Sequence, residues 1–426
     1  MKIKHKFLIA VSVAALAGTL LLTSCSPLGC ATPISRGWAG GTLADGTLFV
    51  ASMNGKLIAI NPANNTQIGS PAQLTTTSTS GLFSCATSAN VVFYSTPVVS
   101  GVKTEPDPNN ANNTLNYQIV YIGGANGMVY AYKFENNTLS SDYLFVYPRQ
   151  ATTGSIVGNI ILDNDTIYYA NSNGYVFALN AEDLTLKWSQ KIDSKIWSGP
   201  TIDGSTLYIG CFNKTLYALN TVDGSIKWQF LADGAINSTP VVDNGTVYIG
   251  DYNRAFYAVD AATGNLKWKF PPDANSAVTP KDFFWAEPVV VNGVIYAPNL
   301  DGHIYALDTV TGKLVKDIPL SYSISSSPVV VGDKIVVATS VASYAESKQK
   351  VNIYIIDTTD NSVSVTIAFP LHEAVNAPLF AIGNIVYLHT YKDNLYTINV
   401  ATAKTDMSTD PNNPQHTFIF NLSTLK

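Results

Sequence analysis

Short apolar runs separated by turn residues dominate the chain, and one stretch shows this pattern most clearly. Between residues 240 and 270, four runs rich in Val, Ile, Tyr and Trp alternate with turn signals that include Asn244-Gly245 and Thr263-Gly264. Runs of this length and composition are typical of strands. An Asn-Gly pair supplies the positive φ values of a tight hairpin turn. The stretch therefore predicts a four-stranded antiparallel meander.

The same unit recurs along the chain. Trp188, Trp228 and Trp268 follow one another at intervals of 40 residues. Units open at a shared type of residue, as at Pro97, Pro200, Pro240, Pro288, Pro328 and Pro378. A period near 40 with four strands per period indicates a β-propeller, in which each sheet buries its faces against its neighbours. We therefore expect an all-β fold, a single eight-bladed β-propeller of four-stranded antiparallel blades over residues 36–426.

Composition agrees with one large propeller and limits its partners. Of the 426 residues, 46% are hydrophobic and 13% are charged, which is sufficient for one extended core. The formal net charge is −5. A mildly acidic chain argues against nucleic acid as a partner, because the phosphate backbone requires a basic face.

The first residues read as a targeting segment. Lysines precede an apolar stretch that ends in Leu-Thr-Ser-Cys25. This arrangement resembles the bacterial lipoprotein signal, in which the cysteine becomes the acylated first residue. We expect residues 1–24 to be removed, Cys25 to carry the lipid and residues 25–35 to act as a tether. An ordinary signal peptide or an N-terminal transmembrane anchor is the alternative.

Three further cysteines are present, Cys30, Cys85 and Cys211. In an oxidising compartment a disulfide between Cys30 and Cys85 is conceivable. Cys211 follows a strand, and we expect it to be a buried thiol.

One repeat carries a recognisable motif. Ala258, Asp260, Thr263, Gly264 and Trp268 form the pattern A-x-D-x-x-T-G-x-x-x-W. This resembles the propeller repeat of the pyrroloquinoline-quinone (PQQ) type. Other units retain part of the pattern, including Trp188, Gly224, Trp228 and Gly312. Together with the lipoprotein signal, it resembles the BamB family of lipoproteins in the outer-membrane β-barrel assembly machinery.

The motif has a structural interpretation. A Trp on the outer strand presents a large flat ring to the adjacent blade, and its ring N–H is free to reach a carbonyl oxygen. Gly264 permits the left-handed conformation in the preceding turn. We therefore assign these residues to packing rather than to chemistry.

Enzymes that share this repeat resemble one another in holding PQQ with a calcium ion, an acidic cluster and commonly a pair of adjacent cysteines. This chain has no adjacent cysteines, and its histidines lack metal-ligand spacing. Asp163-Asn164-Asp165 looks like a ligand run, but between two strands it favours a hairpin turn. We expect no catalytic residue, no metal and no cofactor, with PQQ disfavoured.

A second set of aromatic residues is not explained by the repeat. Residues at one position, three before each blade-opening proline, include Tyr94, Trp197, Asn237, Trp285, Ser325 and Val375, and Glu287 directly precedes a proline. If the first strand of each blade is innermost, these positions meet at one mouth of the central channel. Because aromatic residues are enriched at binding hot spots, Tyr94, Trp197, Trp285 and Glu287 are the predicted partner-binding residues. Alternatively the rings plug the channel or pack under loops, and partners bind the loops at 104–114 or 342–350.

These observations favour a membrane-anchored extracytoplasmic scaffold for protein partners. The resemblance implies a role in outer-membrane protein assembly, as a monomer within a larger complex. We expect the outer membrane and periplasm as its location in a diderm cell, or the cell surface in a monoderm. An extracellular ligand-sensing propeller is the alternative, and a PQQ-dependent dehydrogenase is less favoured, because fold alone does not choose between them.

Overall fold

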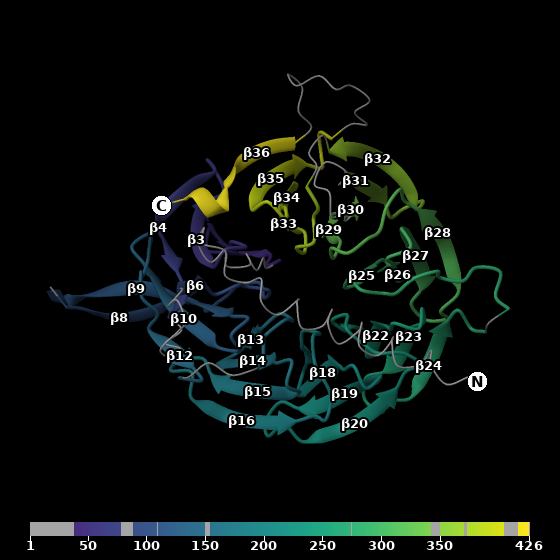
Figure 1. Cartoon of the computed structure of the whole chain (residues 1–426), viewed down its shortest axis with the longest axis horizontal. Coiled ribbons are helices and arrows are strands. Elements are labelled where there is room, and N and C mark those ends of the chain that lie inside the picture. The colour runs from purple at the N-terminus through teal and green to yellow at the C-terminus, as the bar shows by residue number, and fades with distance from the viewer. Residues whose placement is uncertain are drawn as a thin grey trace, which may run out of the picture.

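The computed structural model describes residues 38–77, 88–108, 110–149, 154–273, 275–341, 350–369, 373–403 and 416–425. Within them, eight antiparallel sheets, one for each blade, are arranged in a ring around a common axis (Figure 1). The predicted eight-bladed propeller is therefore confirmed. The expected signal segment and tether, Cys25, Cys30 and Cys85 lie outside the described residues.

Each blade is a continuous piece of chain whose first strand is innermost (Figure 1). Blades 1 and 2 comprise β1 (Gly41–Ala44), β2 (Thr47–Ala51), β3 (Lys56–Asn61), β4 (Thr66–Gln73), and β7 (Val98–Val99), β8 (Lys103–Asp107), β9 (Asn110–Gly123), β10 (Val129–Glu135), β11 (Thr138–Leu139), β12 (Phe145–Tyr147). A two-stranded sheet between them comprises β5 (Thr75–Thr77) and β6 (Ser88–Asn90). Blades 3 and 4 comprise β13 (Ile161–Asp163), β14 (Thr166–Ala170), β15 (Tyr175–Asn180), β16 (Leu186–Lys191), and β17 (Thr201–Asp203), β18 (Thr206–Gly210), β19 (Thr215–Asn220), β20 (Ile226–Leu231).

The remaining blades follow the same order. Blades 5 and 6 comprise β21 (Val241–Asp243), β22 (Thr246–Gly250), β23 (Phe256–Asp260), β24 (Leu266–Phe270), and β25 (Val289–Val291), β26 (Val294–Pro298), β27 (His303–Asp308), β28 (Leu314–Pro319). Blades 7 and 8 comprise β29 (Val329–Val331), β30 (Lys334–Val341), β31 (Lys350–Asp357), β32 (Ser362–Phe369), and β33 (Phe380–Ile382), β34 (Ile385–His389), β35 (Asn394–Asn399), β36 (His416–Asn421), followed by the short 3-10 helix η2 (Leu422–Thr424). None of the described segments is a helix long and apolar enough to cross a membrane.

The inner strands are apolar on both faces because each blade is covered on both sides. In β14, Ile167 and Tyr169 pack with blade 2, whereas Tyr168 and Ala170 pack with blade 4. Each of the eight junctions between neighbouring blades holds one such buried apolar cluster. Successive side chains of a strand point to opposite faces of the sheet, so alternate residues of one strand pack against the two neighbouring blades.

The predicted turns are present. Asn244 and Gly245 join β21 to β22 with φ values of 46° and 66°. Asp163-Asn164-Asp165 forms the corresponding turn between β13 and β14, with Asn164 at φ 50°. The prediction of a hairpin turn at this acidic run is therefore confirmed.

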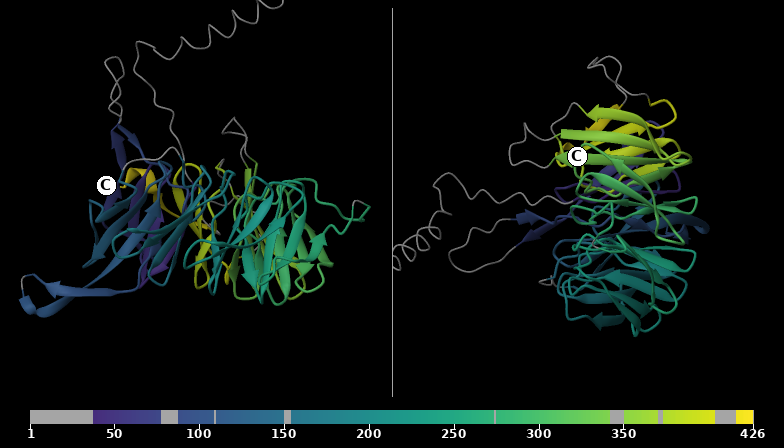
Figure 2. Two further views of the ribbon diagram at one scale, coloured as in Figure 1. Left: turned by 90° about the horizontal axis from the view of Figure 1, so that it is seen from below. Right: turned by 90° about the vertical axis from the view of Figure 1, so that its right-hand side faces the viewer.

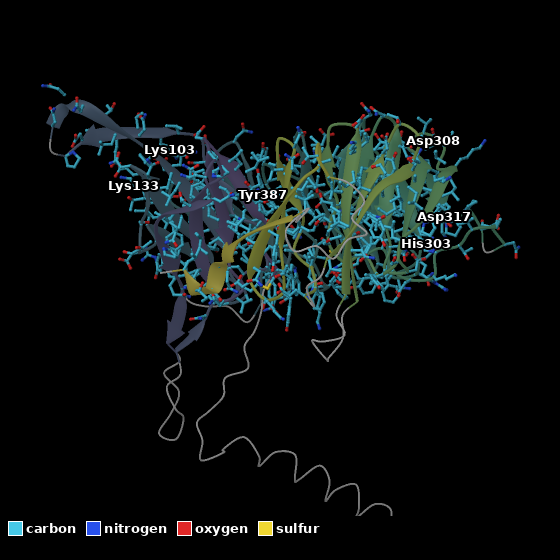
Figure 3. The ribbon with its side chains drawn as sticks, turned by 90° about the horizontal axis from the view of Figure 1, so that it is seen from above. Lys103, Lys133, His303, Asp308, Asp317 and Tyr387 are labelled. Carbon is cyan, nitrogen blue, oxygen red and sulfur yellow. The ribbon has the colours of Figure 1, made fainter. Side chains whose placement is uncertain are left out.

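Blade 2 departs from the expectation of a loop at 104–114. β8 and β9 pair from Lys103↔Tyr117 onward and form a hairpin that projects beyond the rim of the disc (Figure 2). At its base, near Lys103 and Lys133 in Figure 3, the Lys133 Nζ atom lies 2.6 Å from Glu105 and 3.1 Å from Glu135. Its alternating exposed polar side chains conceal the strand pattern. The other expected loop, at 342–350, lies almost entirely outside the described residues.

The ring closes without a strand shared between the first and last blades. β36 is the outer strand of blade 8, where it pairs with β35. Blades 8 and 1 meet through a buried apolar cluster and through Met53, whose backbone N–H donates to Asp393 over 2.8 Å. His389 extends this contact, with Nε2 2.8 Å from Asp393 and Nδ1 3.0 Å from the carbonyl oxygen of Ala39.

The repeat tryptophans seal three successive blade junctions. The Trp188, Trp228 and Trp268 indole N–H groups donate to carbonyl oxygens of the next blade, over 2.8, 3.1 and 3.0 Å. Each ring also lies against a glycine of that blade. A Cβ atom added at Gly224, Gly264 or Gly312 would approach the ring to 2.5, 2.7 and 2.5 Å. Glycine is therefore favoured at these positions for two reasons: a larger side chain would collide with the indole ring, and the backbone has a positive φ.

The glycine contact can be tested against a glycine of matched conformation. Gly312 and Gly245 have φ values of 68° and 66°, but no atom lies within 4 Å of a Cβ added at Gly245. Both changes to alanine carry left-handed strain of about 1–2 kcal/mol. Gly312→Ala also overpacks the Trp268 ring, so we expect it to lower the free energy of unfolding by about 1–3 kcal/mol more. Denaturant unfolding measures both, and equal losses would show that the ring contact does not stabilise the junction.

Candidate functional site at the channel mouth

Strand direction places two groups of loops on one face of the disc. Because successive strands of a blade run in opposite directions, the loops between the second and third strands lie at the same end as the connections into the next blade. We call this the mouth face. The turns that carry Gly224, Gly264 and Gly312 lie on the opposite face.

Hydrogen bonds between residues just before the innermost strands link neighbouring blades around the channel. The Gly40 N–H donates to Thr96 Oγ1 over 3.3 Å, and the Thr96 N–H donates to Asn159 Oδ1 over 2.9 Å. The same link recurs farther round the ring, from the Gly199 N–H to Thr239 over 3.2 Å and from the Glu287 N–H to Ser327 over 3.2 Å. These links fix the height of the inner residues relative to one another.

Two residues before each linking position, the side chains line one cavity at the mouth of the channel. The cavity is open to solvent, and the empty space within it and at its opening is about 570 Å³. In every blade but the last, the residue two positions before the linking residue lines the cavity. These residues are Trp38, Tyr94, Val157, Trp197, Asn237, Trp285 and Ser325. Val375 of blade 8 is buried instead, and Asn376 lines the cavity. The structure thus brings Tyr94, Trp197, Trp285 and Glu287 together, and their binding role stays a prediction.

Sequence reasoning missed Trp38. Its ring lies 4.4 Å from that of Tyr94, measured between centroids. Blade 1 opens at Gly41 rather than at a proline, so counting three residues back from each blade-opening proline did not identify Trp38. The motif Trp-x-Gly, shared by Trp38-Ala39-Gly40 and Trp197-Ser198-Gly199, is the signal that could have found it.

The aromatic lining continues outward over blades 4 to 6. The Trp197 ring lies 4.9 Å from Phe212, which lies 5.9 Å from Tyr252. Tyr252 in turn lies 4.8 Å from Phe283 and 6.2 Å from Trp285. We call these five residues the aromatic patch. All five keep part of their surface accessible, and Phe283 is 37% exposed.

Glu287 is electrostatically unusual within the cavity. Glu287 occupies the linking position of blade 6, and it is the one charged residue among the eight equivalent positions. The other blades have Gly40, Thr96, Asn159, Gly199, Thr239, Ser327 and Ala377 there. No described residue hydrogen-bonds or ion-pairs with its carboxylate. Burial disfavours the ionised form and raises its pKa from 4.5 to about 7. Asn237, which is 8% exposed, also has a buried side-chain oxygen without a hydrogen-bond partner.

Other candidate groups have structural explanations. Cys211 is fully buried and lies in the junction between blades 3 and 4, where desolvation raises the pKa of its thiol. Asp251 accepts hydrogen bonds from the N–H groups of Gly234, Asn253 and Ala255 and thereby holds a loop. Within the described ranges, no group of three or more His, Cys, Asp or Glu side chains could hold a metal ion.

Comparison with known proteins finds one family and a shared fold. Residues 183–345 match the family described as "Outer membrane protein assembly factor BamB". The chain is similar to the crystal structure of BamB from Moraxella catarrhalis, with a TM-score of 0.52, 15% identity, and coverage of 72% of this chain and 88% of that one. No curated protein sequence matches the chain significantly.

Two further solved structures show how widely this fold is used. The computationally designed Ika8 protein has a TM-score of 0.63 and 10% identity, covering 85% of this chain and 96% of that one. Quinohemoprotein alcohol dehydrogenase from Comamonas testosteroni has a TM-score of 0.51 and 14% identity, covering 67% of this chain and 64% of that one. At these identities, the likeness shows the fold alone.

The unusual position of Glu287 predicts a pH-dependent cost to stability. The folded state holds the proton up to about pH 7, whereas the unfolded chain releases it near 4.5. The free energy of unfolding should therefore fall as pH rises between these values. We expect Glu287→Gln to remove this decline and to gain about 1–2 kcal/mol at pH 8, because the partly solvated carboxylate bears less than the full penalty.

Denaturant unfolding at pH 5 and pH 8 measures this effect. Glu182→Gln, which makes the same change at an exposed carboxylate on the opposite face, should leave the pH dependence unaltered. A Glu287→Gln protein with the same pH profile as the unmodified chain would show that this carboxylate is well solvated.

Proposed function

We propose that this chain, a PQQ-repeat β-propeller similar to BamB, is a protein-interaction scaffold of the bacterial cell envelope that binds its partners at the mouth face. The observation that carries the proposal is the aromatic patch, whose rings contact one another and remain partly accessible. The finer assignment, to outer-membrane protein assembly, rests on the matched family description.

The form of the patch supports protein binding. Partly buried aromatic side chains offer a large contact area and lose little conformational freedom, so they are enriched at interface hot spots. The patch is supported from below by three blades whose junctions are sealed by tryptophan contacts. A preorganised surface of this kind loses little entropy when a partner binds.

Membrane attachment is the second part of the proposal, and it rests on the sequence alone. The apolar stretch ending at Cys25 has the form of a lipoprotein signal. Two or more acyl chains on one cysteine would hold the protein stably at a membrane. We expect mass spectrometry of the mature protein to find an acylated Cys25 as the first residue. An unmodified amino terminus at another residue would contradict lipid anchoring.

The channel lining does not fit PQQ, the cofactor used by other proteins with this repeat. PQQ carries three carboxylates, so a site for it needs basic groups or a metal ion. Among the described residues, no Lys or Arg lines the cavity, and the one charged side chain in its lining is the carboxylate of Glu287. This chemistry favours the non-enzymatic function.

A double substitution tests the scaffold function. Trp197→Ala with Trp285→Ala removes the two rings that the cavity and the aromatic patch share. We expect capture of envelope proteins from solubilised membranes to fall about tenfold or more, as for the loss of a hot spot. Because both rings are partly exposed, the melting temperature should change little.

The matched control is Val222→Ala with Val310→Ala. These valines are 79% and 80% exposed and lie in turns of the opposite face. Capture by this control should equal that of the unmodified protein. Full capture by the tryptophan variant, or a loss of capture that parallels unfolding, would overturn the proposal.

A further inference from the structure

We propose that the channel mouth binds the cationic side chain of a lysine or arginine on a partner polypeptide, between the Glu287 carboxylate, the Asn237 amide oxygen and the rings of Trp197 and Trp285. This inference rests on the proposed scaffold function and specifies what that surface recognises. All four residues line the same cavity.

Nothing in the fold requires a carboxylate at position 287. At equivalent positions, Thr96, Asn159, Thr239 and Ser327 use their side-chain oxygens to accept the N–H of the preceding blade. Glu287 makes no such bond to Thr239, although its own N–H donates to Ser327 in the usual way. The side chain therefore departs from the linking role of the equivalent residues and places an unpaired carboxylate in a half-buried position. Such a charge is costly unless a partner compensates it.

A second acceptor points to the same kind of ligand. Asn237 is more than nine-tenths buried, and its Oδ1 atom has no hydrogen-bond partner. A buried polar atom left unpaired costs about 1–3 kcal/mol, which a donor from a ligand would recover. Two unpaired acceptors in one cavity call for a ligand rich in N–H donors.

The remaining lining selects a positive charge and an elongated apolar stem. No Lys, Arg or His of the described part of the chain lines the cavity, so the compensating charge must come from a ligand. The rings of Trp197 and Trp285 provide faces that attract ammonium and guanidinium groups. They also suit the methylene stem of a lysine or arginine.

Other ligands fit less well. Calcium takes six to eight oxygen ligands, commonly from several carboxylates, whereas the described lining residues offer a single carboxylate. A neutral sugar could stack on the indole rings, but it would leave the charge of Glu287 uncompensated.

The source of the cation follows from continuity with the aromatic patch. Trp197 and Trp285 belong both to the cavity and to the patch. A polypeptide bound across the patch would therefore pass the channel mouth and could insert one basic side chain. A free amine could enter the cavity, but it would not contact Phe212, Tyr252 and Phe283, so these rings would add nothing to its affinity.

The proposed contact is pH-dependent. The pKa of Glu287 is about 7 in the free protein, so the carboxylate that attracts the cation forms as the pH rises through neutrality. Within the segments that the structure describes, Tyr94 is the one other titratable side chain that lines the cavity, and burial raises its pKa above the usual 10.0. The affinity for a basic side chain should therefore increase from pH 6 to pH 8.

Short peptides provide the test. The probe is acetyl-Leu-Lys-Leu-amide, and its matched control replaces lysine with norleucine, which keeps the stem and lacks the ammonium group. Binding to the purified mature protein is followed by tryptophan fluorescence and by calorimetry at pH 6 and pH 8. We expect the lysine peptide to bind at least about tenfold more tightly than the norleucine peptide at pH 8, since hydrogen bonds to a charged group contribute strongly.

Protein variants show which residues are responsible. Glu287→Gln should abolish the preference for lysine and its pH dependence, whereas Glu182→Gln on the opposite face should retain both. Asn237→Ala should weaken lysine binding without changing the pH dependence. Both Glu287→Gln and its control must show cooperative unfolding in the same experiment.

Several outcomes would overturn the inference. Equal affinity for the lysine and norleucine peptides, or a Glu287→Gln protein that keeps the preference, would exclude charge recognition. Binding of n-butylammonium as tightly as the lysine peptide would identify a free amine as the ligand. Tight binding of calcium alone, or of PQQ with calcium, would assign the cavity to a different chemistry. If the peptides fail while Trp197→Ala with Trp285→Ala still abolishes partner capture, the scaffold function stands and the lysine site is wrong.

Discussion

The central constraint on this structure is close packing between neighbouring blades, and at three successive junctions it takes the form of a contact between a tryptophan of one blade and a glycine turn of the next. Each indole ring of Trp188, Trp228 and Trp268 lies where no side chain beyond glycine fits, and each ring N–H finds a carbonyl oxygen. A single four-stranded sheet cannot bury both of its faces. The circle of eight blades is therefore stable only when the junctions between blades are close-packed. Close-packed junctions, together with the hydrogen bonds that link the residues just before the innermost strands, hold these strands at fixed relative heights, and the separate connections therefore form one channel mouth.

The repeat made most of the fold predictable. Regular proline and tryptophan spacing predicted the blades, and Asn244-Gly245 predicted a hairpin turn that the structure contains. Where the repeat fails, the prediction also fails. The β8–β9 hairpin was expected to be a loop because its side chains are mostly polar and include prolines, so the sequence lacks the apolar alternation of a strand.

The candidate site was predictable in part for the same reason. Tyr94, Trp197 and Trp285 were found by their distance from a blade-opening proline, and Trp38 was missed where that proline is absent. Phe212, Tyr252 and Phe283 come from loops whose positions in the sequence do not reveal that they share a face. Residues that belong to the repeat pattern, such as Trp268, stabilise the junctions between blades. Residues that depart from it, such as Glu287, gather at the mouth.

Site-specific photo-cross-linking in intact cells tests most directly the central claim that partners bind at the mouth face. A photoreactive phenylalanine would replace Tyr252 in the aromatic patch or, as the comparison, the exposed Val222 on the opposite face. We predict discrete adducts with envelope proteins from position 252 and none of these adducts from position 222. The same adducts from both positions, or adducts from position 222 alone, would contradict the account.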